Sequence, residues 1–233
     1  MIKLEKYEVL GWEHAVRGMR NPKNSWKMSD SLMSTAAIEE GWAALGPKDL
    51  DLMNRLRNAG TDHRKFMRMI TVYVDITAPL FWWKEFDTYK VGTVANSCST
   101  MHKIHDKEFT WEDFSMEHLL RIEDQDIPYS SNAHYIFDYI EIKNAIIDAL
   151  NTARQMYLET KDKKYWWQMI QLLPSSYNQK RTIMLNYEVL ANMYKSRKNH
   201  KLDEWREFCE WIESLPYAEL ITGGRSNDLN EQS

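Results

Sequence analysis

The side chains best suited to take part in a reaction or to bind a ligand lie in the stretch TYKVGTVANSCS, residues 88–99. This stretch follows an apolar and aromatic run. The stretch is almost free of charge, is rich in small polar groups and holds one of the chain's 2 cysteines. A thiol becomes a nucleophile when a base or a positive neighbour lowers its pKa. Lys90 and His102 are near Cys98 in sequence alone, so we favour a structural role for a small, half-buried thiol. The stretch is either a simple turn or a loop that holds a ligand.

A second segment, NYEVLANMYKSR at residues 186–197, combines amides with cations. On a helix of about 3.6 residues per turn, Asn186 and Arg197 share a face, and Asn192 lies inside the same helix. Asparagine is a poor residue for a helix interior, so the two asparagines need partners in the protein or in a ligand. Composition alone favours the structural explanation.

The remaining composition excludes several classes of function. The 7 histidines form no HxH or HExxH cluster, so we predict no metal site. There is no GxGxxG or P-loop pattern. The formal net charge of −4 argues against binding nucleic acid or an anionic membrane through bulk charge. No apolar run reaches the length of a membrane span, and the N-terminus lacks a signal-peptide pattern. The cysteines show no disulfide framework, so we expect a cytoplasmic protein.

The chain is unusually aromatic, with 10 tryptophans and 12 tyrosines that are partly doubled, as in Trp82-Trp83 and Trp166-Trp167. Aromatic side chains bury the largest area per residue. We therefore favour core and subunit-interface positions for them, with a stacking wall for a planar ligand as the alternative.

Periodicity predicts one mixed α+β domain over residues 1–221, with an antiparallel-type sheet and long helices, and a disordered tail over 222–233. The alternation of apolar residues predicts a strand at 66–77, and two further strands are predicted at 2–9 and 178–186. Helical spacing and stop signals predict helices at 11–20, 48–59, 79–87, from 135 onward, 166–173 and 187–214, with a loop and short helix at 110–124.

Five segments occur in a fixed order along the chain: DHRKF at 62–66, APLF at 78–81, Asn96 followed by Ser99, LLP at 172–174, and Asn186, Asn192 and Arg197. Their order and spacing resemble flavin-dependent thymidylate synthases, over residues 60–105 and 170–212. The resemblance implies an α+β homotetramer that holds FAD between subunits and binds dUMP beside it. NADPH would be the reductant and methylene-tetrahydrofolate the carbon donor.

The resemblance also implies roles for individual residues. Cofactor contacts are implied for His63, Tyr89, Lys90, Asn186 and Asn192. Substrate contacts are implied for Glu85, Lys90, Asn96, Ser99 and Arg197. Of these, Ser99 and Arg197 are implied to be catalytic. Glu85 stands where the family usually has a glutamine.

The chain departs from the family's pattern at its arginines. After a one-residue insertion, Thr88-Tyr89-Lys90 stands against an Arg-His-Arg triplet, and Met101, Ile170 and Glu188 stand at three further arginine positions. Arginine is preferred for bidentate phosphate contacts. Four cations are candidate replacements: Arg17, Arg20, Lys23 and Arg181.

Three hypotheses follow from these features. The leading one is a flavin-dependent transfer of a one-carbon unit to C5 of a pyrimidine nucleotide, of the dUMP-to-dTMP type. The second, motivated by the lost arginines, is a non-catalytic nucleotide-binding or assembly protein on the same fold. The third is a flavin-dependent enzyme that makes another 5-modified pyrimidine nucleotide.

Overall fold

The computed structural model describes residues 2–32, 44–121 and 138–223. Its strands are β1 (Lys3–Leu10), β2 (Thr71–Pro79), β3 (Val94–Ser97) and β4 (Asn178–Asn186). Its α-helices are α1 (Trp12–Arg20), α3 (Pro47–Asn58), α4 (Leu80–Phe86), α5 (Tyr139–Thr160), α6 (Lys163–Leu172), α7 (Tyr187–Arg197), α8 (Asp203–Glu213) and α9 (Glu219–Thr222). Short 3₁₀ helices include η3 (Arg64–Met69) and η4 (Trp111–Asp113). The mixture of helices and sheet confirms the predicted α+β class.

The contacts within the chain group into two compact units. The first, called the sheet unit here, comprises residues 2–77, 84–96 and the described residues from 180 onward. The second, called the hairpin unit, comprises residues 78–83 and 97–179. The single domain over 1–221 stays a prediction. Most of the tail predicted at 222–233 lies outside the described residues, as do 122–124 of the predicted short-helix region and 135–137 of the predicted long helix.

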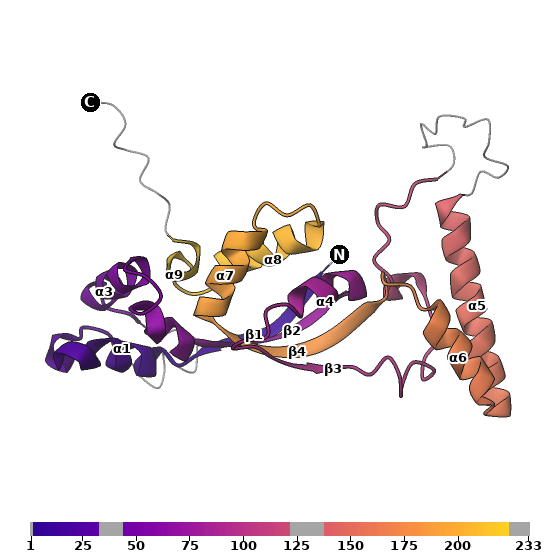
Figure 1. The fold of residues 1–233 in the computed structure, drawn as a ribbon, viewed down its shortest axis with the longest axis horizontal. Helices are drawn as coiled ribbons and strands as arrows, with labels where there is room; N and C mark the ends of the chain where they lie inside the picture. The colour runs from indigo at the N-terminus through magenta and orange to yellow at the C-terminus, as the bar shows by residue number, and fades with distance from the viewer. Residues whose placement is uncertain (1, 33–43, 122–137, 224–233) are drawn as a thin grey trace. The chain divides into compact units, whose positions relative to one another are not determined.

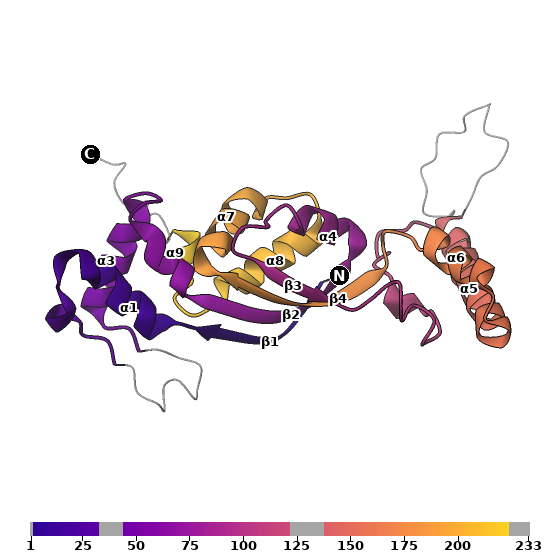
Figure 2. The same cartoon turned by 60° about the horizontal axis from the view of Figure 1, so that its bottom comes forward.

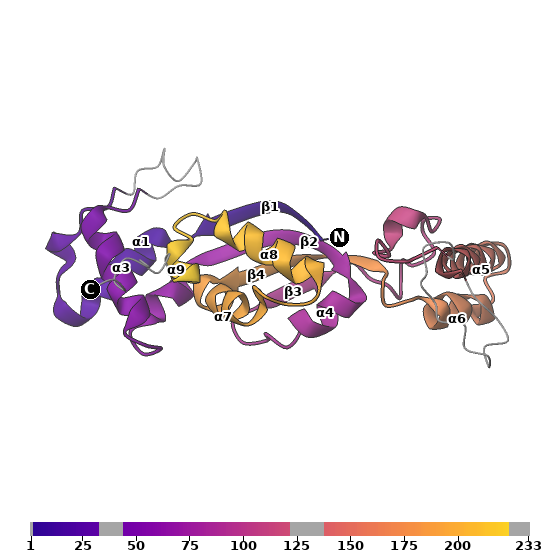
Figure 3. The same ribbon diagram turned by 90° about the horizontal axis from the view of Figure 1, so that it is seen from above.

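The sheet has the strand order β1-β2-β4-β3. β1 pairs antiparallel with β2, and the register is irregular between Glu5 and Glu8. Helices α7 and α8 lie on one side of the sheet (Figures 1 and 3). The alternation predicted in β2 is confirmed, because Val72, Val74 and Ile76 are buried while Tyr73 is 43% exposed.

Three predicted boundaries are wrong. The helix expected over 166–173 begins at Lys163, because Asp162 caps it there. The strand expected from residue 66 begins at Thr71, because the preceding apolar residues belong to η3, where Phe66 and Met67 are buried without sheet pairing. The helix expected over 187–214 is two helices, α7 and α8, separated by residues 198–202. The stretch 88–99 also differs from a plain loop, because Val94–Ser97 forms the exposed edge strand β3.

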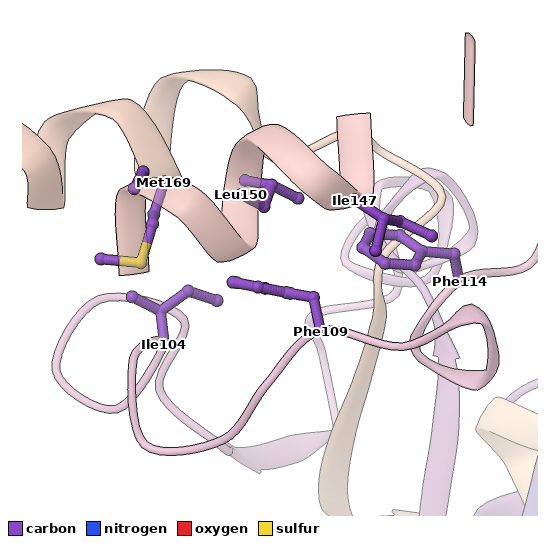
Figure 4. Close-up of a cluster of buried hydrophobic side chains, with 7 residues drawn as sticks. Ile104, Phe109, Phe114, Ile147, Leu150 and Met169 are labelled. Atoms are coloured by element: carbon purple, nitrogen blue, oxygen red, sulfur yellow. The ribbon is translucent and has the colours of Figure 1, made fainter. Parts of the chain in front are cut away.

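The hairpin unit is built on α5 and α6, which lie side by side (Figures 1 and 2). Lys161 turns the chain between them in the left-handed conformation, and the Asp162 carboxylate caps α6 by accepting from the Lys164 N–H. A hydrophobic cluster that includes Phe109, Leu150 and Met169 joins the helices to the loops of this unit (Figure 4). Of the tryptophan doublets, Trp82 and Trp83 are buried, whereas Trp167 is 42% exposed.

In the sheet unit, α1 is joined to α3 by a buried ion pair. Arg20 Nη2 lies 2.5 Å from Asp49 Oδ1, and the two side chains are 3% and 0% exposed. The hydroxyls of Ser29 and Ser31 donate to the other carboxylate oxygen at 2.6 Å each. Burial opposes ionisation of Asp49, but these hydrogen bonds and Arg20 outweigh burial and lower its pKa. Asp49 is therefore a charged and fully paired group.

We expect Asp49→Asn to lower the free energy of unfolding by roughly 3–5 kcal/mol, because it leaves a buried guanidinium without a counter-charge. The matched control is Asp51→Asn on the same helix, whose side chain is 65% exposed beside Arg55 and should cost less than about 1 kcal/mol. Urea denaturation measures both, and equal losses would contradict the assignment.

The same pair sets a pH dependence. The pKa of Asp49 is lowered in the folded state, so its contribution is complete above the pKa of an unfolded aspartate. The contribution is lost as the pH falls toward the folded-state pKa. In Asp49→Asn this part of the acid destabilisation should disappear from a series of urea titrations at decreasing pH.

Candidate functional site

Arg197, at the end of α7, is the centre of a cluster in the sheet unit that joins three of the predicted site residues. Its Nη1 lies 2.5 Å from Glu85 Oε2, and its Nε donates to the Tyr89 hydroxyl at 3.0 Å. The guanidinium carbon also lies 4.8 Å from the ring centroid of Trp205, a cation–π distance. Glu85, Tyr89 and Arg197 are therefore brought together as the resemblance implies.

Glu85 is the acceptor that organises this cluster. The same oxygen that binds Arg197 also accepts from Trp205 Nε1 at 3.0 Å, and His200 Nε2 lies 3.3 Å away. The side chains of Arg197 and Glu85 are 19% and 34% exposed, so the pair is only partly screened by water. The chain's own carboxylate thus neutralises the arginine that the resemblance assigns to the nucleotide.

A cavity of about 300 Å³ adjoins the cluster. It is lined by Phe86, Asp87, Tyr89, Lys90, Thr93 and Ala95. Asp87 is paired with Arg181 at 2.7 Å, whereas Lys90 is exposed and forms no ion pair with any residue that the structure describes. Lys90 is therefore a cation that this cavity can offer to an anionic ligand.

Gly92 brings the loop against the start of α7. Its φ of +79° is in the left-handed region, and a Cβ there would lie 3.0 Å from Asn186 Nδ2 and 3.1 Å from Val189 Cγ2. A side chain here would be strained by the positive φ and tight against both neighbours, so the position favours glycine. Asn186 is the N-cap of α7, where the predicted strand at 178–186 meets the predicted helix from 187. Its Oδ1 accepts from the Val189 N–H at 3.1 Å, so Asn186 does not share the helix interior with Asn192. Its amide nitrogen donates no hydrogen bond among the described residues.

The other predicted site residues are not drawn into the cluster. His63, Asn96 and Asn192 are exposed in the sheet unit, and their side chains make no hydrogen bond within the described ranges. Ser99 belongs to the hairpin unit, where its hydroxyl accepts from the backbone N–H groups of Met101 at 3.2 Å and His102 at 2.9 Å. Their roles toward cofactor and substrate stay predictions. Cys98 is exposed, so the expectation of a half-buried thiol is wrong.

Two of the candidate replacement cations are in buried or partly buried ion pairs, and a third, Arg17, lies 3.9 Å from Glu13 on the surface. Arg20 is bound to Asp49 and Arg181 to Asp87. Arg17 is exposed, lies 3.0 Å from His14 Nδ1, and lines a separate cavity of about 250 Å³ near Trp26. Lys23 is exposed.

Three residues of the site were missed from the sequence: His200, Trp205 and Asp87. Trp205 was visible only as part of an apolar helix face, and its distance in sequence from Glu85 gave no signal of their contact.

Among the described residues there is no group of three or more histidine, cysteine, aspartate or glutamate side chains that could hold a metal ion. Nor does any helix of the described ranges have the length and apolarity to cross a membrane.

The four-stranded sheet, with α7 and α8 on one side of it, has the fold of flavin-dependent thymidylate synthases. No family model matches the sequence, and no curated protein sequence matches it significantly. A flavin-dependent thymidylate synthase ThyX from Helicobacter pylori, complexed with FAD and dUMP, has a TM-score of 0.63 at 16% identity. The match covers 95% of this chain and 98% of that one.

Two further structures extend this likeness. A second structure of the H. pylori protein, also with FAD and dUMP, has a TM-score of 0.63 at 17% identity and covers 96% of this chain and 98% of that one. The UMP/dUMP methylase PolB from Streptomyces cacaoi, bound with 5-Br dUMP, has a TM-score of 0.55 at 14% identity over 92% of this chain and 88% of that one. At these identities the likeness shows the fold.

We expect Glu85→Gln to lower the free energy of unfolding by about 1–3 kcal/mol, because it leaves Arg197 half-buried without a counter-charge. The control is Glu13→Gln, whose side chain is 60% exposed and lies 3.9 Å from Arg17; it should change stability by less than about 0.5 kcal/mol. Chemical denaturation measures both. A Glu85→Gln protein as stable as the parent would show that the pair contributes nothing in solution.

Proposed function

We propose that this chain is a flavin-dependent enzyme that transfers a one-carbon unit to C5 of a pyrimidine nucleotide, of the dUMP-to-dTMP type. The observation that carries the proposal is the fold, which matches enzymes complexed with FAD and dUMP over 95% of this chain. The cluster around Arg197, at positions assigned from the sequence order, supports it further. As the resemblance to the family implies, the active assembly would be a homotetramer in the cytoplasm.

The cavity beside Tyr89 fits a nucleotide. Its volume of about 300 Å³ is at the lower end of the range for small-molecule pockets, which are lined by apolar and aromatic groups with a few polar ones. Tyr89 offers an aromatic ring and Lys90 an unpaired ammonium group for a phosphate. Arg197 would bind the nucleotide once Glu85 releases it, and Asn96 would complete the substrate site within the sheet unit.

The residues proposed for FAD fit its polar ring system. The amide nitrogen of Asn186 is available as a donor, since only its oxygen is used in the helix cap. His63 and the amide of Asn192 are exposed and make no side-chain hydrogen bond within the described ranges, so both can turn toward a ligand. When bound, FAD would supply the redox chemistry that turns the transferred unit into a methyl group, with electrons from NADPH and carbon from methylene-tetrahydrofolate.

One observation favours the second candidate, a non-catalytic nucleotide-binding or assembly protein. Arg197 is already neutralised by Glu85 at 2.5 Å, so a nucleotide must displace an internal carboxylate before it reaches the guanidinium. An enzyme for another 5-modified pyrimidine nucleotide differs only in the product.

The test is turnover by the full chain. Purified protein is mixed with FAD, NADPH and methylene-tetrahydrofolate, and dUMP, UMP and dCMP are offered in turn. Mass spectrometry of the nucleotide product distinguishes methylation from hydroxymethylation. We expect a yellow protein whose flavin spectrum changes on addition of dUMP. A protein that neither binds FAD nor gains thermal stability from it would overturn the flavin part, and tight nucleotide binding without turnover would support the non-catalytic alternative.

We expect Glu85→Gln to bind dUMP more tightly than the parent, because the nucleotide no longer competes with an internal carboxylate for Arg197. Arg197→Gln should weaken dUMP binding by about tenfold or more, the effect of losing one hydrogen bond between charged groups. Lys195→Gln removes an exposed cation from the same helix and is the matched control. Isothermal titration calorimetry measures all three, and unchanged affinity in both site variants would place the nucleotide elsewhere.

A further inference from the structure

The arginines of the sheet unit differ in how their charge is balanced. Three buried or half-buried arginines each have a carboxylate of their own. These pairs are Arg20–Asp49, Arg181–Asp87 and Arg197–Glu85. Arg64 and Arg68 of η3 instead share the single carboxylate of Glu188. One positive charge of this trio is therefore left without a partner inside it.

Glu188 holds both arginines by their Nε edges. The Nε of Arg64 donates to Glu188 Oε1 at 3.1 Å, and the Nε of Arg68 donates to Oε2. The carboxylate is only 10% exposed, whereas the two arginine side chains are 26% and 50% exposed. Burial opposes ionisation of Glu188, but the two arginines outweigh burial and lower its pKa. The carboxylate is therefore charged and fixes the orientation of both guanidinium groups.

Donors remain available on both arginines. Neither Nη atom of Arg64, nor Nη1 of Arg68, makes a hydrogen bond with any residue in the described part of the chain. Guanidinium groups held at one edge, with further N–H donors available, match the bidentate geometry by which arginine binds phosphate oxygens.

The neighbourhood adds positive charge. Burial lowers the pKa of Arg57, and the nearby charge of Arg64 lowers it further. Arg57 donates to the carbonyls of Leu220 and Ile221, so it is part of the scaffold. The opposing charges are Glu188 and Asp62, which both raise the pKa of Arg68. Three guanidiniums thus face two carboxylates, an arrangement that favours an added anion.

We propose that Arg64 and Arg68, aligned by Glu188, form a binding site for a phosphate group. Position 188 is one at which the sequence resemblance expects an arginine, so the positive charge has moved from the start of α7 to η3. The backbone joins these segments, since the Tyr187 N–H donates to the Ile70 carbonyl at 3.1 Å. The anion site stands on this geometry; that its phosphate belongs to FAD or to a nucleotide rests on the proposed function.

The test compares ligands with and without phosphate in the full-length protein. Inorganic pyrophosphate, FAD, riboflavin, dUMP and deoxyuridine are titrated by calorimetry into the parent, Arg64→Gln and Arg68→Gln. Each variant should bind the phosphate-bearing ligand about tenfold more weakly than the parent, the effect of one lost hydrogen bond between charged groups. The affinity for the phosphate-free analogue should not change. The control is Arg55→Gln, an arginine that is 68% exposed on α3. Arg68, which is 50% exposed, keeps the test decisive if Arg64→Gln does not fold.

The outcomes separate this site from the proposed function. If the arginine variants bind FAD more weakly but bind dUMP as the parent does, the site holds the pyrophosphate of FAD. If they bind only dUMP more weakly, the site holds the nucleotide phosphate. Pyrophosphate binding that depends on the arginines, without FAD or dUMP binding, upholds the anion site and rejects the function. The proposal is contradicted if the variants lose the same affinity for FAD as for riboflavin, or if their affinities equal those of the Arg55→Gln control. It is also contradicted if the parent protein binds none of the phosphate-bearing probes.

Discussion

Tyr187, the first residue of α7, fixes the helix on which the candidate site depends. Its side chain is buried completely, its hydroxyl donates to the Pro216 carbonyl at 2.5 Å, and its N–H donates to the Ile70 carbonyl. Burial raises the pKa of Tyr187 well above its ordinary value, so the phenol stays a neutral donor. The ring meets Trp12 edge to face at 5.3 Å. The start of α7 is thus anchored to Ile70 just before β2, to α1 and to the segment before α9 at once.

The two ends of this anchored helix carry side chains of opposite charge. At its first turn, Glu188 carries negative charge where the helix dipole favours it, and at its last turn Arg197 carries positive charge where the dipole favours that. Each charge forms ion pairs with residues from elsewhere in the chain. Glu188 pairs with two arginines, which leaves an excess of positive charge. Arg197 pairs with one carboxylate, which neutralises its charge. One helix therefore separates a site suited to an anion from a site lined by aromatic rings.

Local patterns predicted most elements of the fold, and their failures have physical causes. Strand β4 is predicted at residues 178–186, between the proline turn at Pro174 and the helical pattern from residue 187, and it forms at those bounds. The break between α7 and α8 was missed because apolar positions resume at helical spacing after residue 202. The predicted helix begins at residue 187, after Asn186, and the capping preference of asparagine was the signal for its role as N-cap. The contacts Tyr89–Arg197 and Glu85–Trp205 join residues 108 and 120 positions apart, so no local spacing reveals them.

The length of α7 limits how one ligand can use both ends. Glu188 and Arg197 are nine residues apart, a rise of about 13 Å along a helix. Within one chain, a mononucleotide seated beside Tyr89 and Arg197 leaves the arginines at the other end for a different phosphate. A dinucleotide cofactor carries a planar ring system and a pyrophosphate at separate points of one long molecule. The charge excess at Arg64 and Arg68 therefore agrees better with the phosphate of the proposed cofactor than with that of the proposed substrate, to which the cavity beside Tyr89 offers Lys90.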